Sequence, residues 1–169
     1  LPMAGASDRA AVAPPSPRQT SADAGPSHLL YIEDNEVNQR LMESMLALRP
    51  GTQLEIASHP IEGLERLAQR WPDLLLLDIQ LPEIDGFEVL RRVRAMPGGQ
   101  ALPVVAVSAN AMSRDLQAAR EAGFDEARRL LKQRLQVPEG ELDSLVRLLH
   151  SQLDLSLSGA LRSRAEPER

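Results

Sequence analysis

Residues 74–78 read Leu-Leu-Leu-Leu-Asp, and this run decides the fold class. Four consecutive leucines show no polar alternation, so they predict a short strand that is buried on both faces. Strands of this kind occur almost only in parallel sheets whose two faces are covered by helices. The run therefore predicts an α/β domain in which Asp78 stands at the carboxyl end of a central strand.

The sequence on either side of this run alternates short apolar stretches with helical spacing. We predict further strands at residues 28–32, 53–57 and 103–107, and a segment with helical periodicity follows each of them. Four strand–helix units predict a parallel sheet with right-handed crossovers and helices on both faces. We assign the buried face of the first helix to residues spaced 4, 4 and 3 apart, namely Val37, Leu41, Met45 and Leu48.

Both ends of the chain differ in composition from this core. Residues 1–27 are rich in Ala, Pro, Ser and Gly, and such a segment buries too little apolar area to offset its backbone entropy. We interpret residues 1–27 as a flexible linker or tail, residues 28–153 as one domain, and residues 154–169 as a flexible C-terminal tail. The full length of 169 residues suits one domain of ordinary size.

The overall composition excludes several classes of function. The net charge of −5 argues against nucleic acid or an anionic membrane as a partner. The chain has no cysteine, which excludes disulfides, thiolate metal sites and cysteine nucleophiles. The longest apolar runs are far shorter than the ~20 residues that a membrane-spanning helix needs. We therefore expect a cytoplasmic protein without membrane contact.

Acidic residues follow two of the predicted strands. Glu33 and Asp34 come directly after the first strand, and Asp78 ends the third. With a flavodoxin-like strand order of 2-1-3-4-5, these two strands are neighbours at the switch point where ligands bind. Three carboxylates in one crevice repel one another, so the site either holds a proton or recruits a cation. Mg²⁺ is the ordinary choice among hard divalent ions with oxygen ligands.

Four motifs in register resemble the receiver domain of two-component response regulators. They lie at residues 31–35, 78–86, 107–111 and 122–125. The first strand and its helix look most like the receivers at the C-terminal end of hybrid histidine kinases. The resemblance implies a flavodoxin-like (βα)5 doubly wound parallel sheet and a function in phosphorelay signalling.

The resemblance also implies a role for each residue of the site. Asp78 would be the nucleophile that takes a phosphoryl group from phosphohistidine, so that the domain catalyses its own modification without being a turnover enzyme. Glu33, Asp34, Asp78 and the backbone carbonyl of Gln80 would bind Mg²⁺. Ser108 would hydrogen-bond a phosphoryl oxygen and act as the switch. The partner would be a histidine kinase or a histidine phosphotransfer protein.

The lysine and the fifth strand depart from the pattern of the family. Receivers place a lysine seven residues after the glycine of the Gly-Phe-Asp segment, with a proline next. The only lysine here, Lys132, lies nine residues after Gly123 and precedes Gln133. We retain Lys132 as the candidate that neutralises charge on the transferring group. Residues 126–136 read as an amphipathic helix rather than a strand buried on both faces, which puts the fifth strand in question.

Three other interpretations remain open at this point. The first is a degenerate module of receiver fold that binds a partner but is no longer switched. The second is a metal-dependent phosphatase with an aspartyl nucleophile, although such enzymes need a second acid where this chain has Gln80. The third is a nucleotide-binding flavodoxin-like protein, although no glycine-rich loop follows the first strand.

We expect the remaining conspicuous residues to be structural. The three histidines are predicted to lie at the surface or at strand edges. Packing is predicted for Tyr31, Trp71, Phe87 and Phe124, and a solvated helix face for Arg91, Arg92 and Arg94.

Overall fold

The protein consists of strands and helices that alternate along the chain, and the computed structural model describes residues 27–107 and 113–147. The strands are β1 (Ser27–Ile32), β2 (Thr52–Ala57), β3 (Leu74–Asp78) and β4 (Val104–Val107). The helices are α1 (Glu36–Ala47), α2 (Pro60–Gln69), α3 (Gly86–Ala95), α4 (Ser113–Ala122) and α5 (Ala127–Leu135). A 3₁₀ turn, η1 (Gly99–Ala101), precedes β4, and residues 139–147 form a further helical segment.

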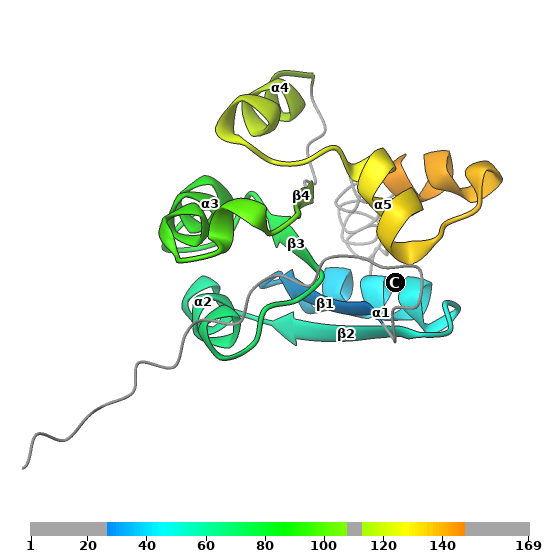
Figure 1. The fold of residues 1–169 in the computed structure, drawn as a ribbon, viewed down its shortest axis with the longest axis horizontal. Helices are drawn as coiled ribbons and strands as arrows, with labels where there is room; N and C mark the ends of the chain where they lie inside the picture. The colour runs from blue at the N-terminus through cyan, green and yellow to red at the C-terminus, as the bar shows by residue number, and fades with distance from the viewer. Residues whose placement is uncertain (1–26, 108–112, 148–169) are drawn as a thin grey trace, which may run out of the picture.

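The four strands form one parallel sheet in the order β2-β1-β3-β4 (Figure 1). These are the first four positions of the predicted order 2-1-3-4-5, and the α/β class is confirmed. The register places Ile32 of β1 beside Leu77 of β3. The carboxyl ends of β1 and β3 therefore lie next to each other, at the edge of the sheet where the predicted acidic residues follow.

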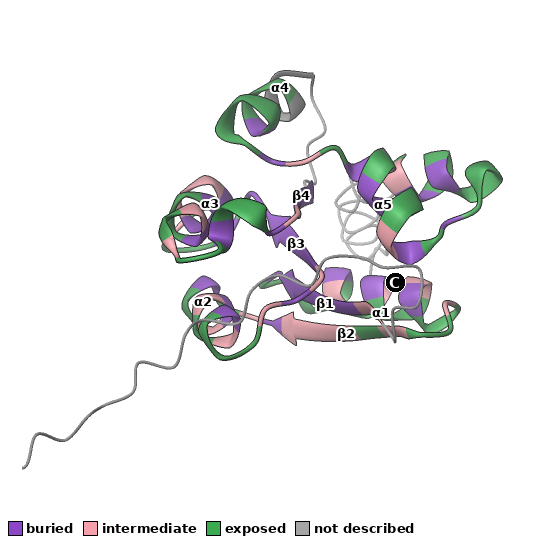
Figure 2. Cartoon of the chain, viewed as in Figure 1, coloured by how far each residue is buried: buried purple, intermediate pink, exposed green. Residues whose placement is uncertain are grey.

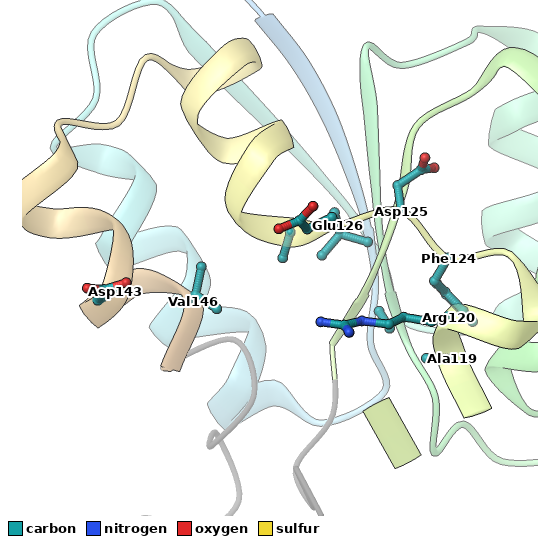
Figure 3. Close-up of a pocket in the computed structure, with 10 residues that line it drawn as sticks. Ala119, Arg120, Phe124, Asp125, Glu126, Asp143 and Val146 are labelled. Atoms are coloured by element: carbon teal, nitrogen blue, oxygen red, sulfur yellow. The ribbon is translucent and has the colours of Figure 1, made fainter. Parts of the chain in front are cut away.

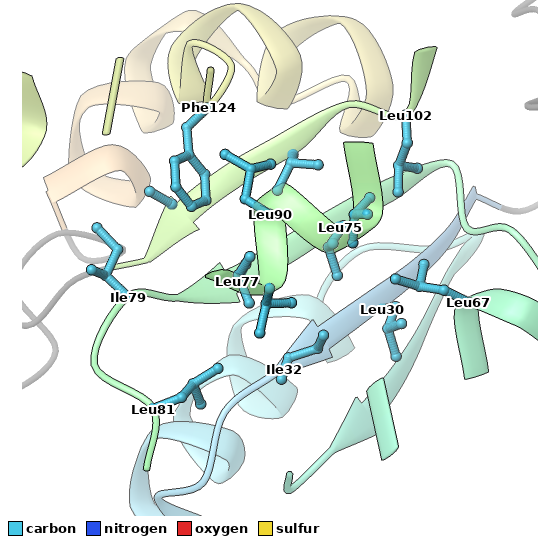
Figure 4. Packing of buried hydrophobic residues seen from close by; sticks show 14 of the residues in the cluster. Leu30, Ile32, Leu67, Leu75, Leu77, Ile79, Leu81, Leu90, Leu102 and Phe124 are labelled. Carbon is cyan, nitrogen blue, oxygen red and sulfur yellow. The ribbon is translucent and has the colours of Figure 1, made fainter. Parts of the chain in front are cut away.

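Helices cover both faces of the sheet. Alternate residues of each strand point to opposite faces, so the apolar side chains form one cluster on each side. Leu75 and Leu77 pack in a cluster with residues of α2, α3 and α4 (Figure 4). Leu74 and Leu76 pack in a second cluster with residues of α1, α5 and the segment 139–147. Every residue of β3 and β4 is buried (Figure 2). The prediction of a central strand buried on both faces is thus confirmed.

The buried face of α1 differs from the predicted one. Asn38, Met42 and Leu46 are the buried residues of this helix. Val37 is 60% exposed and Leu48 is 84% exposed, so the predicted face is wrong by about one residue of rotation. Apolar residues occur at both sets of positions, and only the packing of α1 on the sheet selects between them.

A helix occupies the stretch in which the fifth strand was in question. Residues 127–135 form α5, and its leucines are buried against the face of the sheet that α1 also covers. No strand follows β4 within the described residues. The helix is favoured because Leu130, Leu131 and Leu135 lie on one side of it, whereas Arg129 and Lys132 remain exposed.

Apart from Ser27, which begins β1, the two predicted tails lie outside the described residues. Within the described part of the chain, no helix combines the length and the apolar character needed to cross a bilayer.

Two of the structural predictions need correction. His28 is buried in the central strand β1 rather than at the surface or a strand edge, and its Nε2 lies 2.9 Å from Oε2 of Glu55. Arg94 is not solvated: its guanidinium donates hydrogen bonds to three backbone carbonyls, those of Gly99, Leu102 and Gly123. A long side chain at the end of a helix can reach such carbonyls, and its position alone did not reveal them.

Candidate functional site

Three carboxylates meet at the carboxyl ends of β1 and β3. Glu33 and Asp34 follow β1, and Asp78 is the last residue of β3. One carboxylate oxygen from each of the three residues lies within 4.8 Å of the others. The structure therefore brings together three of the predicted site residues, from positions more than forty residues apart in the sequence.

The acidic cluster is mostly shielded from water. Glu33 is 1% exposed and Asp78 is 7% exposed, whereas Asp34 is exposed. The pKa of Asp78 is raised from its ordinary value of 3.8 to about 7, mainly because the carboxyl group is buried and also because the negative charges of Glu33 and Asp34 lie nearby. The hydrogen bond from the backbone N–H of Gln80 opposes this shift. Near neutral pH, Asp78 is therefore poised between its protonated and ionised forms.

Hydrogen bonds hold Glu33 in a fixed orientation. The Tyr31 hydroxyl donates to Oε2 at 2.7 Å, and the backbone N–H of Asn35 donates to Oε1 at 3.0 Å. Burial raises the pKa of Glu33, and these two hydrogen bonds counteract the rise. Gln39 also binds this turn, because its side-chain amide donates to the backbone carbonyl of Glu33 at 2.6 Å.

Tyr31 was predicted from the sequence only to pack in the core, but it also contributes to the site. Its ring does pack in the core, but its hydroxyl binds Glu33. The two residues are separated by one position at the end of a strand, and residues i and i+2 of a strand share a face. That spacing was a usable signal, because a buried tyrosine hydroxyl usually finds a hydrogen-bond partner.

The loop after β3 requires a glycine close to Asp78. A Cβ atom on Gly86 would lie 2.3 Å from the backbone oxygen of Asp78, which is closer than atoms can approach. The Gly86 N–H also donates to the carbonyl of Ile79 at 2.9 Å. Asp85 caps α3 by accepting a hydrogen bond from the N–H of Glu88. The predicted helix start at Gly86 is confirmed, and it places α3 directly against the end of β3.

The donor set of this cluster suits a hard divalent cation. Its ligand atoms are carboxylate oxygens, which Mg²⁺, Mn²⁺ and Ca²⁺ prefer over nitrogen and sulfur. A cation here would offset the mutual repulsion of the three acids, which the raised pKa of Asp78 reflects. The carbonyl of Gln80 belongs to the loop beside Asp78, and its role as a ligand stays a prediction.

Of the two other predicted site residues, only Lys132 belongs to the part of the chain that the structure describes, and its described ion pair is not with this cluster. Ser108 lies outside the described residues. Lys132 lies on α5, where its Nζ atom is 2.7 Å from Oε2 of Glu139 and its side chain is exposed. The catalytic roles of both residues stay predictions.

Comparison with known proteins agrees with this geometry. The family model described as response regulator receiver domain matches residues 29–134. The chain is 34% identical over 100 residues to the polar-differentiation response regulator DivK of Brucella anthropi, covering 59% of this chain and 80% of that protein.

Two further relatives are sensor histidine kinases. The chain is 32% identical over 119 residues to sensor histidine kinase RcsC of Escherichia coli, which covers 70% of this chain but only 12% of RcsC. The receiver domain of sensor histidine kinase PA1611 from Pseudomonas aeruginosa has a similar structure, with a TM-score of 0.57 and 29% identity, covering 68% of this chain and all of that one. That receiver was crystallised with a magnesium ion coordinated in its active-site cleft.

Proposed function

Because this chain belongs to the response regulator receiver domain family of two-component signalling, we propose that it accepts a phosphoryl group from phosphohistidine onto Asp78, with Mg²⁺ as cofactor. The observation that carries the proposal is the meeting of Glu33, Asp34 and Asp78 within 4.8 Å. The magnesium ion in the related receiver of PA1611 supports Mg²⁺ as the cation.

The ionisation of the cluster suits this reaction. Asp78 must be ionised to attack phosphorus, and its pKa of about 7 leaves a large ionised fraction at neutral pH. Glu33, Asp34 and Asp78 would hold the ion with the Gln80 carbonyl. When bound, Mg²⁺ supplies positive charge that favours the ionised carboxylates and stabilises charge on the transferring group.

The chemical step exchanges one bond to phosphorus for another. A carboxylate oxygen of Asp78 forms a bond to phosphorus while the phosphorus–nitrogen bond of the donor breaks, and the donor imidazole takes up a proton. The buried position of Asp78 limits access by bulk water, which would otherwise compete for the phosphoryl group. Ser108 and Lys132 would complete the site by binding phosphoryl oxygens.

We propose a histidine kinase or a histidine phosphotransfer protein as the donor. Val37 lies three residues after Asp34 at the start of α1 and is 60% exposed, which offers an apolar contact beside the site. Similarity to RcsC and to the receiver of PA1611 supports a place in a hybrid histidine kinase. This phosphotransfer would take place in the cytoplasm.

The test is phosphorylation by a small donor. The protein is incubated with acetyl phosphate and Mg²⁺, and the intact mass is measured. We expect a mass increase of one phosphoryl group, which disappears in Asp78→Asn and in the presence of a chelator. Asp85→Asn is the matched control, because asparagine also caps helices and this loop residue lies outside the cluster. A mass increase that persists in Asp78→Asn, or none in the wild type, contradicts the proposal.

One observation favours a second candidate, a receiver-fold module that is no longer switched. The helix α5 occupies the stretch in which the family has its fifth strand, and that strand normally carries the signal to the surface. Phosphorylation would then change the NMR spectrum only around the acidic cluster. Shifts that extend to β4, α4 and α5 would instead support a switched receiver.

A further inference from the structure

A polar cavity of about 230 Å³ lies at the amino end of β4. The strands are parallel, so this end of the sheet is opposite the acidic cluster, which follows the carboxyl ends of β1 and β3. The cavity is bounded by the end of α3, the turn that precedes β4, and α5. The described polar side chains that line it are those of Arg94, Gln100, Asp125, Arg129, Gln133 and Arg134.

Positive charge dominates this cavity. Three arginines line it, and the one carboxylate among the described lining residues is that of Asp125. Two of the arginines share this carboxylate: Nη2 of Arg94 lies 3.3 Å from Oδ2, and Nη2 of Arg129 lies 3.7 Å from Oδ1. The third, Arg134, is half-buried. The whole chain carries a net charge of −5, so the excess of positive charge is a local feature of this cavity.

The edge of β4 holds the Asp125 carboxylate in its place. The backbone N–H of Asp125 donates to the Val104 carbonyl at 2.7 Å, and the Val104 N–H donates to Oδ2 of Asp125 at 3.0 Å. Asp125 thereby takes the position of a neighbouring strand at the beginning of β4. Figure 3 shows a second cavity, of about 270 Å³, beside α5, and the Asp125 carboxylate points away from it. One fixed negative charge therefore faces the three arginines.

Arg94 is a cation held in a fixed position. Its guanidinium donates hydrogen bonds to the carbonyls of Gly99, Leu102 and Gly123, at distances of 2.7, 2.6 and 3.1 Å. These acceptors are neutral, so they orient the guanidinium without cancelling its charge. The side chain is only 18% exposed, and a partly buried charge attracts an anion more strongly than one in bulk water. A fixed side chain also loses little conformational entropy when a ligand binds.

The two arginines of α5 supply the opposite wall of the cavity. Arg129 and Gln133 lie one turn apart, and Nη1 of Arg129 donates to Oε1 of Gln133 at 3.2 Å. Arg134 lines the cavity next to Gln133. The planar guanidinium group presents pairs of N–H donors that match two oxygens of a phosphate or a carboxylate. The cavity thus combines one fixed arginine with two on a helix that faces it.

We propose that this cavity binds a phosphate dianion, free or as a small phosphomonoester, through Arg94, Arg129 and Arg134. The volume of about 230 Å³ is below the ~300–1,000 Å³ of pockets for drug-sized ligands, so the ligand is small. Three arginines facing one carboxylate leave an excess of positive charge that a dianion offsets better than a monoanion does. The site is separate from the acidic cluster, and the inference does not depend on the proposed phosphotransfer.

NMR titration of the full chain with inorganic phosphate tests the site. In a buffer of constant ionic strength without divalent cations, we expect saturable shifts of the amides at 99–103 and 129–134, and none at the acidic cluster. Arg129→Gln/Arg134→Gln should bind phosphate at least about tenfold more weakly, through loss of charged hydrogen bonds. The matched control, Arg91→Gln/Arg92→Gln, removes the same charge from exposed residues that pair with Glu88, and should bind like the wild type. Amides of β1 and β3 report whether each variant is folded.

Two results of this titration overturn the proposal. The first is a shift that does not saturate in the wild type, and the second is equal weakening in both double variants, which would indicate only a general attraction of anions.

Other anions test the charge and the source of the ligand. Acetate should bind at least about tenfold more weakly than phosphate, because it carries one charge, and equal affinity overturns the assignment to a dianion. Tighter binding of glycerol 3-phosphate than of inorganic phosphate supports a small phosphomonoester as the ligand, whereas equal or weaker binding supports free phosphate. Asp78→Asn should bind phosphate like the wild type, so this site can be tested whether or not Asp78 accepts a phosphoryl group. Weaker binding in Asp78→Asn would place the phosphate at the acidic cluster and overturn the proposal.

Discussion

The Tyr31 hydroxyl donates a 2.7 Å hydrogen bond to Oε2 of Glu33, and both side chains are buried. This bond links the hydrophobic core under α1 to the acidic cluster, because the Tyr31 ring packs in that core. It also favours the ionised form of Glu33, whose pKa burial otherwise raises. The core residue thus controls both the orientation and the charge of a proposed Mg²⁺ ligand.

Removal of this hydroxyl should weaken the binding of Mg²⁺. Tyr31→Phe keeps the ring but loses the hydrogen bond, so the pKa of Glu33 rises. A proton then competes more strongly with Mg²⁺ for the Glu33 carboxylate. We predict about tenfold weaker binding at neutral pH, the effect of losing one hydrogen bond to a charged group. Isothermal titration calorimetry measures the affinity. Ser27→Ala is the control, because it removes a hydroxyl at the other end of β1 that donates to the Arg134 carbonyl. Wild-type affinity in Tyr31→Phe refutes the prediction.

The raised pKa of Asp78 should make the protein less stable as pH rises. An unfolded chain releases this proton near pH 3.8, whereas the folded protein keeps it until about pH 7. Between these values, stability falls with rising pH, and above them it is constant. Asp78→Asn has no proton to lose, so we expect it to raise the free energy of unfolding by about 2–4 kcal/mol at about pH 8 without divalent cations.

Urea denaturation at several pH values measures this difference between Asp78→Asn and the wild type. The difference should shrink toward pH 3.8, where both states hold the proton. Mg²⁺ should also reduce it, because a ligand of the folded state stabilises only the wild-type cluster. A pH-independent difference would show that Asp78 does not titrate as its surroundings indicate.

Gly86→Ala should disturb the site by steric contact. The added Cβ would lie 2.3 Å from the Asp78 oxygen, so the end of β3 and the start of α3 must move apart. We predict a loss of about 2–4 kcal/mol in the free energy of unfolding, the range for overpacked backbone positions, and weaker Mg²⁺ binding. Gly140→Ala is the matched control, because nothing lies within 4 Å of its added Cβ. A stable Gly86→Ala protein with wild-type Mg²⁺ affinity would contradict this prediction.

The two arginines of α3 should differ sharply in their effect on stability. Arg94→Met removes the donor for three carbonyls and the ion pair to Asp125, which itself satisfies the edge of β4. We predict a loss of about 2–4 kcal/mol, because buried acceptors remain without partners. Arg91→Met is the control: its side chain is exposed and, among the described residues, pairs only with Glu88, so the melting temperature should barely change. Thermal denaturation measures both variants, and an equal fall in melting temperature for Arg94→Met and Arg91→Met would contradict this prediction.

The ion pair between Lys132 and Glu139 allows a test of the proposed lysine. If Lys132 neutralises the phosphoryl group, it must exchange Glu139 for that group. We predict that Lys132→Gln slows phosphorylation by acetyl phosphate, and that Glu139→Gln accelerates it by releasing the amine. Initial rates of mass increase measure both effects. Unchanged rates in both variants would remove Lys132 from the site.

Local patterns in the sequence were sufficient to predict the four strands and the residues of the acidic cluster. The four-leucine run marked β3 as buried on both faces, since only a strand covered by helices on both faces tolerates such a run. The observed order of the four strands agrees with the flavodoxin-like order that the family resemblance implied, and this order places the ends of β1 and β3 side by side. The meeting of Glu33 and Asp78 is therefore a consequence of the topology that the sequence predicts.

The rotation of α1 and the partners of Arg94 and Lys132 were decided only in the tertiary structure. Spacing predicts which residues share a helix face, but the packing of that helix on the sheet decides which face is buried, as Val37 shows. Long cationic side chains reach carbonyls and carboxylates far away in the sequence, so their partners depend on the folded chain. Sequence fixes what is periodic and local, whereas packing chooses among nearly equivalent faces and distant partners, because their differences in free energy arise only when the elements meet.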